Sequence, residues 1–127
     1  MELKVALALV KAYHEKLGYD YVYPSPNEQM EHLRSLVLAQ VAETIETLNE
    51  TPWKPWRDIA DQKFNKVAAA EEIVDQFFFL AAQWFCLGLK PQTFEFIFAD
   101  KLQENLDRID RGYNKTAETS KQGDPEL

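Results

Sequence analysis

The chain has 127 residues and a formal net charge of −7; 46% of its residues are hydrophobic and 13% are aromatic. This length suits one domain with a packed core, and the negative charge argues against binding to nucleic acid or to an anionic membrane, since both need a positive protein surface. The lone cysteine, Cys86, excludes a disulfide framework. The N-terminal apolar run is too short to span a bilayer and has no basic n-region or cleavage site, so a cytoplasmic protein is expected.

The first half of the chain predicts two helices. Apolar residues keep helical spacing over residues 2–17, and Gly18 is the expected stop. Ser25 as a cap and Pro26 at the first helical position begin a second helix, which runs to about Asn49. The expected core side of this helix comprises Met30, Leu33, Leu36, Val37, Val41, Ile45 and Leu48.

The second half predicts two more helices. The third covers roughly 65–87 and is apolar nearly all round over 73–87, which marks a central buried helix. A short helix through residues 59 and 60 is one option ahead of it. The fourth helix runs from about 93 to 111, and the polar stretch 113–127 is expected to be a disordered tail.

The fold class that follows is all-α. Short links between long helices favour antiparallel neighbours, and therefore a four-helix bundle formed by residues 1–112 as a single domain. The third helix is so apolar that it calls for more burial than one chain provides. We therefore expect the bundle to be completed in a homodimer or a higher homo-oligomer.

Two pairs of acidic residues are spaced for a shared site. Glu43-x-x-Glu46 lies on the second helix and Glu72-x-x-Asp75 on the third, and residues three apart point the same way, roughly 60° apart around the axis. If the two helices pack face to face, four carboxylates meet, and they must then be protonated or neutralised by cations. A solvated acidic face is the common alternative. The apolar sequence around both pairs favours the buried site, and an all-oxygen ligand set favours Mg²⁺ or Mn²⁺.

Two further segments offer cations. The turn after the second helix holds two tryptophans with Lys54 and Arg57; it either closes the end of the bundle or presents a cation to phosphates. On the fourth helix, Lys101, Asn105 and Arg108 share one face and suit polyphosphate oxygens. The acidic residues interleaved with them favour a solvated surface instead.

The linker between the first two helices, GYDYVYPSP, is rich in aromatic residues. Tyr19, Tyr21 and Tyr23 either cover the core or line a pocket for a base. His14, just before this linker, is expected to be a surface or core residue and not a ligand.

The order of these motifs resembles a known group of enzymes. E-x-x-E, then WKPW, then E-x-x-D, then K-x-x-x-N-x-x-R-x-x-x-G-Y occur over roughly residues 36–113. This arrangement is similar to the all-α nucleoside triphosphate pyrophosphohydrolases, the superfamily that joins MazG-like proteins to the dimeric dUTPases and dCTPases.

The resemblance implies a role for each motif residue. It implies Mg²⁺, for which Mn²⁺ would substitute, on the four acidic residues, and it implies that Glu43 or Glu46 orients or deprotonates the attacking water. Trp53 is a candidate base-stacking surface, together with Tyr19, Tyr21 and Phe78. The residues implied to contact the nucleotide phosphates are Lys54, Lys101, Asn105, Arg108 and Tyr113.

The base-reading part of the pattern departs from the family. Dimeric dUTPases carry a glutamine-leucine-asparagine type pattern in the first helix, where this chain has Lys11, Tyr13 and His14. The histidine-phenylalanine pair usual after E-x-x-D is Phe77-Phe78 here. The base therefore stays open between dUTP or dCTP and a purine such as dGTP.

The expected function is hydrolysis of a phosphoric anhydride bond. A nucleotide-pool enzyme would convert a (deoxy)nucleoside triphosphate and water to the monophosphate and pyrophosphate, with no nucleic-acid or membrane partner. The alternative is a non-catalytic helical binding or scaffold module whose carboxylates hold a structural ion or none.

Overall fold

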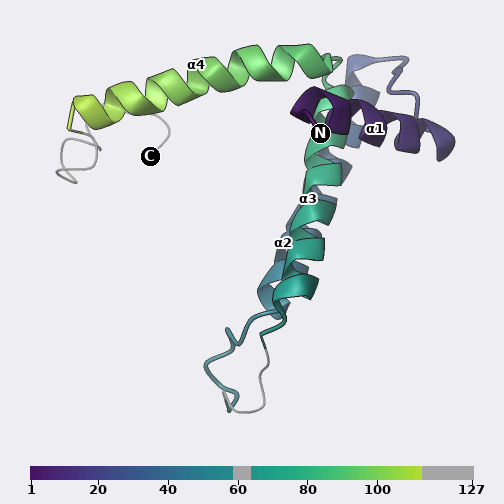
Figure 1. Ribbon diagram of the computed structural model, residues 1–127. Coiled ribbons are helices and arrows are strands. Elements are labelled where there is room, and N and C mark those ends of the chain that lie inside the picture. Colours follow the sequence, from purple (N-terminus) through teal and green to yellow (C-terminus); the bar gives the residue numbers. More distant parts are fainter. Residues whose placement is uncertain (59–63, 113–127) are drawn as a thin grey trace. The chain divides into compact units, whose positions relative to one another are not determined.

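The computed structural model describes residues 1–58 and 64–112, and every regular element within these ranges is an α-helix (Figure 1). The all-α prediction is confirmed for this part of the chain. The short helix considered at 59 and 60, the tail 113–127 and the predicted phosphate contact Tyr113 lie outside the described residues. The helices are α1 (Leu3–Lys16), α2 (Pro26–Asn49), α3 (Lys66–Cys86) and α4 (Pro91–Asp110).

Capping residues define where the helices begin and end. Ser25 caps α2, because its Oγ accepts a hydrogen bond from the Glu28 amide at 3.3 Å, and Pro26 follows at the first helical position. Asn65 caps α3 in the same way, with its Oδ1 3.0 Å from the Ala68 amide. Gly18 follows α1 with a φ of 98°, a left-handed conformation that glycine adopts without strain.

The chain divides into two compact units, Met1–Lys90 and a second that begins at Pro91. The first unit contains α1, α2 and α3; the second contains α4 and is described by itself. A single domain over residues 1–112, with all four helices in one bundle, therefore stays a prediction.

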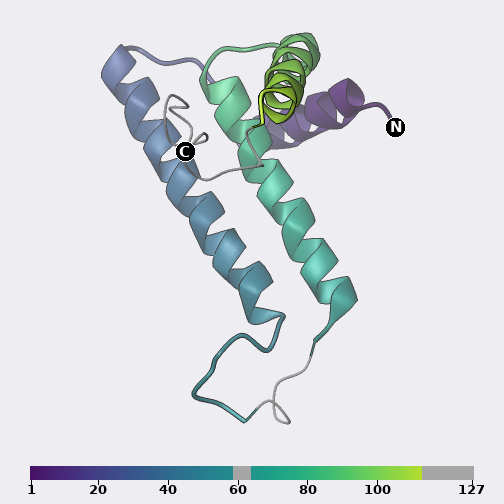
Figure 2. The ribbon, with the colours of Figure 1, turned by 90° about the vertical axis from the view of Figure 1, so that its left-hand side faces the viewer.

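In the first unit, α2 and α3 lie side by side and antiparallel (Figure 2). Neutral hydrogen bonds join them along their length: Gln29 Nε2 donates to the Cys86 carbonyl at 2.9 Å, and Gln83 Nε2 donates to Gln40 Oε1 at 2.7 Å. These contacts pair the start of α2 with the end of α3, so they define the register of the two helices.

The core lies between α1 and the second half of α3. Leu7 and Val10 of α1 are buried, as are Ala81, Ala82, Phe85 and Cys86 of α3; Ala69, in the first turn of α3, is buried apart from them. No residue of α2 is fully buried.

The burial predicted for α2 and α3 is wrong in part for the single chain. Val41 and Ile45 of α2 were expected in the core but are 53% and 47% exposed, and Ile73 of α3 is 57% exposed. Helical periodicity identifies an apolar face, but it does not say whether the same chain covers that face.

Within the described ranges, no single helix has both the length and the apolar character needed to cross a membrane.

Candidate carboxylate site and adjoining pocket

The antiparallel pairing of α2 and α3 brings acidic side chains together. Glu43, Glu46 and Glu72 each offer a carboxylate oxygen, and these three oxygens lie within 4.8 Å of one another. Glu43 and Glu46 reach the group from one face of α2 because they are three residues apart, and Glu72 reaches it from α3. The structure thus brings three of the four predicted acidic residues together.

Asp75, the fourth predicted ligand, lies beside this group without belonging to it. It lines the same pocket as Glu43, and its negative charge is one of the causes that raise the pKa of Glu43. Its side chain is exposed, whereas Glu43 and Glu72 are half-buried. Asp75 is therefore placed to contribute at the pocket wall.

The three carboxyl groups share a crowded and partly dry environment. Burial raises the pKa of Glu43 to about 7, and the neighbouring Glu46 is the next cause. The pKa of Glu72 is also raised, first by burial and then by Glu46. Within the described part of the chain, one buried oxygen of Glu43 and one of Glu72, each Oε2, have no hydrogen-bond partner.

These features fit a divalent cation. Unpartnered buried carboxylate oxygens are costly unless a proton or a cation meets them. Carboxylates alone form a hard oxygen ligand set, which suits Mg²⁺ or Mn²⁺ better than softer metals.

A polar seam next to the carboxylates holds α2 and α3 in this register. Thr44 Oγ1 donates to Gln76 Oε1 at 3.0 Å, and Gln76 Nε2 donates to Thr47 Oγ1 at 2.8 Å. Gln76 therefore bridges two residues of α2 that flank Glu46 in sequence. The sequence reasoning missed this seam, although Gln40, Thr44 and Thr47 recur at helical spacing and could have indicated it.

We expect Gln76→Ala to lower the affinity for Mn²⁺ by about tenfold or more, because residues that orient metal ligands typically contribute that much. Isothermal titration calorimetry with Mn²⁺ measures it. The matched control is Gln83→Ala, which removes the other seam contact, with Gln40, farther along α3. Equal losses in both variants would mean that Gln76 acts only through the general packing of the helices.

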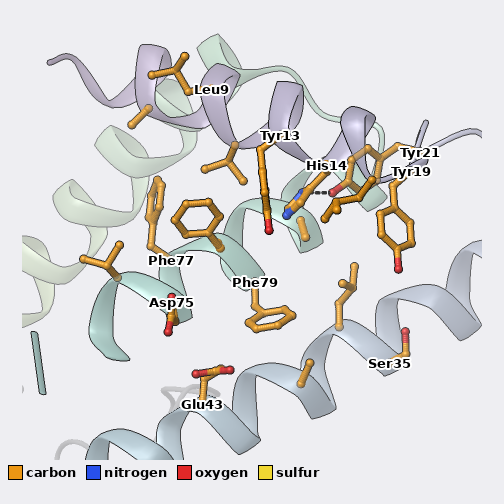
Figure 3. A pocket seen from close by; sticks show the side chains of 18 of the residues that line it. Leu9, Tyr13, His14, Tyr19, Tyr21, Ser35, Glu43, Asp75, Phe77 and Phe79 are labelled. Carbon is orange, nitrogen blue, oxygen red and sulfur yellow. Dashed lines mark hydrogen bonds between the residues drawn. The ribbon is translucent and has the colours of Figure 1, made fainter. Parts of the chain in front are cut away.

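A pocket of about 1010 Å³ opens from the carboxylates toward α1 (Figure 3). Its volume is at the upper end of the range for small-molecule sites. Glu43 and Asp75 lie at one end, near Phe77 and Phe79 of α3, and Tyr19 and Tyr21 of the linker after α1 lie at the other. The aromatic and imidazole residues in its wall are Tyr13, His14, Tyr19, Tyr21, His32, Phe77, Phe78 and Phe79.

The two histidines of the chain are paired with tyrosines at this second end. The Tyr21 hydroxyl is hydrogen-bonded to His14 Nδ1, and the Tyr23 hydroxyl lies 2.6 Å from His32 Nδ1. Tyr19 stacks on His32 with ring centroids 5.7 Å apart. Tyr19 and Tyr21 thus line the pocket, which favours the pocket alternative for the linker tyrosines.

His14, expected to be a surface or core residue, is half-buried and lines the pocket. His32 and Ser35 are pocket residues that the sequence reasoning missed. His32 lies on the face of α2 that continues through Leu36 and Ala39 to Glu43, and this helical spacing was the available signal.

The tryptophan turn is anchored at the end of α2. Trp53 Nε1 donates to Asn49 Oδ1 at 3.0 Å, and the Trp53 ring meets Trp56 edge to face. The ammonium of Lys54 lies 5.9 Å from the centre of the Trp53 ring. Among the described residues, the pocket wall includes neither Trp53 nor Lys54, so their contacts with a nucleotide stay predictions.

The residues predicted on α4 share a face, as expected. Arg108 donates to Asn105 Oδ1 at 2.8 Å and to Glu104 Oε1 at 3.0 Å, and Lys101 pairs with Glu104 Oε2 at 3.2 Å. Because α4 belongs to the second unit, a contact between these residues and a phosphate bound at the carboxylates stays a prediction.

Comparison with known proteins finds no matching family model, no matching curated protein and no matching solved structure. What the site can bind therefore follows from its own side chains. Three carboxylates lie close enough together to share one cation, and the adjoining pocket is lined by flat rings and a few polar atoms.

Proposed function

We propose that the protein is a Mg²⁺-dependent nucleoside triphosphate pyrophosphohydrolase, which converts a (deoxy)nucleoside triphosphate and water to the monophosphate and pyrophosphate. One observation carries the proposal: a carboxylate cluster that suits a divalent cation shares Glu43 with an aromatic-lined pocket large enough for a nucleotide. The order of the motifs, which resembles that of the all-α pyrophosphohydrolases, supports it.

The cation would be held by Glu43, Glu46 and Glu72, with Asp75 available at the pocket wall. When bound, Mg²⁺ supplies positive charge to phosphate oxygens and acidifies a coordinated water. Mn²⁺ would substitute, because it accepts the same oxygen ligands.

The chain's own residues would orient the reacting groups. Glu43 or Glu46 accepts a proton from water, whose oxygen forms a new bond to phosphorus. The anhydride bond between the α- and β-phosphates breaks, and its bridging oxygen leaves with the electron pair. Rings along the pocket, such as Tyr13 and Phe78, which meet edge to face at 5.7 Å, exclude water around the base.

Further contacts to the substrate and a second copy of the chain are part of the proposal. Lys54, Lys101, Asn105 and Arg108 contact the phosphates. A second copy of the chain covers the exposed apolar positions of α2 and α3, including Val41, Ile45 and Ile73, and completes a MazG-like bundle in a cytoplasmic homodimer.

A substrate panel tests the function. The protein is incubated with dATP, dCTP, dGTP, dTTP, dUTP and GTP, with Mg²⁺ or with EDTA, and pyrophosphate and nucleoside monophosphate are quantified. Equal amounts of the two products, formed only with Mg²⁺, are expected for at least one nucleotide. A folded protein that releases pyrophosphate from none of them contradicts the proposal.

One observation favours the scaffold alternative. Glu104 already pairs with Lys101 and Arg108, so these two cations are engaged within α4. A structural ion without catalysis would raise the melting temperature with Mn²⁺ while the panel stays negative.

A further inference from the structure

The polar atoms at the aromatic end of the pocket form a small and specific set. His14 lies beside Tyr13 with one edge toward Tyr21 and the opposite edge toward the pocket (Figure 3). The surrounding wall is mainly apolar, with residues such as Leu9, Val10 and Leu36. A few polar groups in an apolar pocket usually fix the orientation of a ligand.

The hydrogen bond to Tyr21 determines what His14 can offer. Burial raises the pKa of Tyr21 to about 12, so the phenol keeps its proton, and burial lowers the pKa of His14, so the imidazole is neutral. In the tautomer in which the phenol donates to His14 Nδ1, Nδ1 is the acceptor and the ring proton lies on Nε2. The edge of His14 that faces the pocket is then a hydrogen-bond donor.

The backbone at Tyr21 supports a specific role for this contact. Its φ is 57°, a left-handed conformation that costs a residue with a side chain about 1–2 kcal/mol. Such strain is kept where a side chain must be held in one place. At Tyr21 the result is a hydroxyl placed against His14.

We propose that His14, oriented by Tyr21, donates a hydrogen bond to O4 of a pyrimidine base or O6 of guanine, so that the preferred substrates carry uracil, thymine or guanine. This proposal rests on the proposed function and names its substrate class. An amino group at the same edge, as in cytosine or adenine, would place a second donor against the Nε2–H and leave it without an acceptor.

The sharpest comparison is dUTP against dCTP, which differ at that edge alone. We expect kcat/KM to favour dUTP by about 10- to 100-fold, the usual effect of one buried donor left unsatisfied. Tyr21→Phe frees His14 Nδ1 to carry the proton, so it should lower this ratio about tenfold, and His14→Ala should abolish the preference. Tyr23→Phe is the control, because it removes the hydroxyl paired with the other histidine, His32, and Tyr23 is not among the described residues that line the pocket.

A second readout keeps failure of this proposal separate from failure of the proposed function. Imidazole ¹⁵N spectra of the unmodified protein report the His14 tautomer, and titration with dUMP and dCMP reports base preference without turnover. A protonated Nε2 and tighter dUMP binding uphold the proposal even if no triphosphate is hydrolysed. A protonated Nδ1, or equal use of dUTP and dCTP by an active protein, overturns it and leaves the hydrolase function standing.

Discussion

Replacing Glu72 with glutamine is expected to lower kcat/KM for the preferred nucleotide by about 100-fold or more, because the substitution removes one of three clustered carboxylates. Glutamine keeps the size of the side chain and its tendency to form a helix, so α3 should persist. Pyrophosphate release under saturating Mg²⁺ measures the loss, and circular dichroism verifies the helix content.

The neighbouring residue provides a matched control. Glu71 precedes Glu72 on the same helix, but its side chain is exposed and it is not one of the clustered residues. Glu71→Gln removes the same charge and should leave activity within about twofold, as expected for a surface substitution. Without divalent cations, we expect Glu72→Gln to be the more stable protein. Its melting temperature should exceed that of the unmodified protein, because the substitution relieves repulsion among the carboxylates. Equal activity in the two variants would place the catalytic metal site elsewhere.

The second large effect concerns stability against pH in the absence of divalent cations. The pKa of Glu43 rises from 4.5 to about 7 on folding, so between these values the folded protein holds a proton that the unfolded chain has released. Folding stability from this group is therefore present below pH 4.5 and is lost as the pH rises toward 7. Glu43→Gln removes the titration, and we expect this variant to become progressively more stable than the unmodified protein across that range, as measured by urea unfolding in EDTA.

His14 gives folding stability the opposite pH dependence. Burial lowers the pKa of His14, so the stability that this residue contributes is lost as the pH falls. The loss is the same in Glu43→Gln and in the unmodified protein, so it cancels when the two are compared. Adding Mn²⁺ at pH 7.5 to one hundred times the dissociation constant should stabilise the unmodified protein by about 2.7 kcal/mol. This gain should reverse its lower stability relative to Glu43→Gln, which Mn²⁺ should affect little. A stability difference that does not change between pH 4.5 and 7 would show that the Glu43 proton is not held by the fold.

Local spacing made the helices and most of the carboxylate site predictable. The caps at Ser25 and Gly18 are short-range signals, and the three-residue spacing of Glu43 and Glu46 determines that they share a face of α2. Whether α3 would present Glu72 or Asp75 to that face depends on the rotation of one helix against the other. That rotation is determined by contacts such as those of Gln76, which lie 29 and 32 residues away along the chain.

The aromatic end of the pocket was less predictable for a related reason. Tyr21 reaches His14 because the backbone turns into the left-handed region, where glycine or asparagine would ordinarily be expected. The one local signal is Asp20, whose Oδ1 accepts from the Val22 amide at 2.9 Å, and an aspartate alone does not predict a left-handed tyrosine after it. Similarly, the spacing of Val41 and Ile45 identified an apolar face of α2, but the partner that would cover it is not encoded nearby in the sequence.

The seam between α2 and α3 consists of amide and hydroxyl groups, which do not titrate between pH 4 and 9. Sliding one helix past the other by a turn, 5.4 Å, would break all of these bonds at once. The clustered acids therefore cannot relax by moving apart along the helices when their protons leave. Their mutual repulsion therefore stays concentrated at one point between α2 and α3.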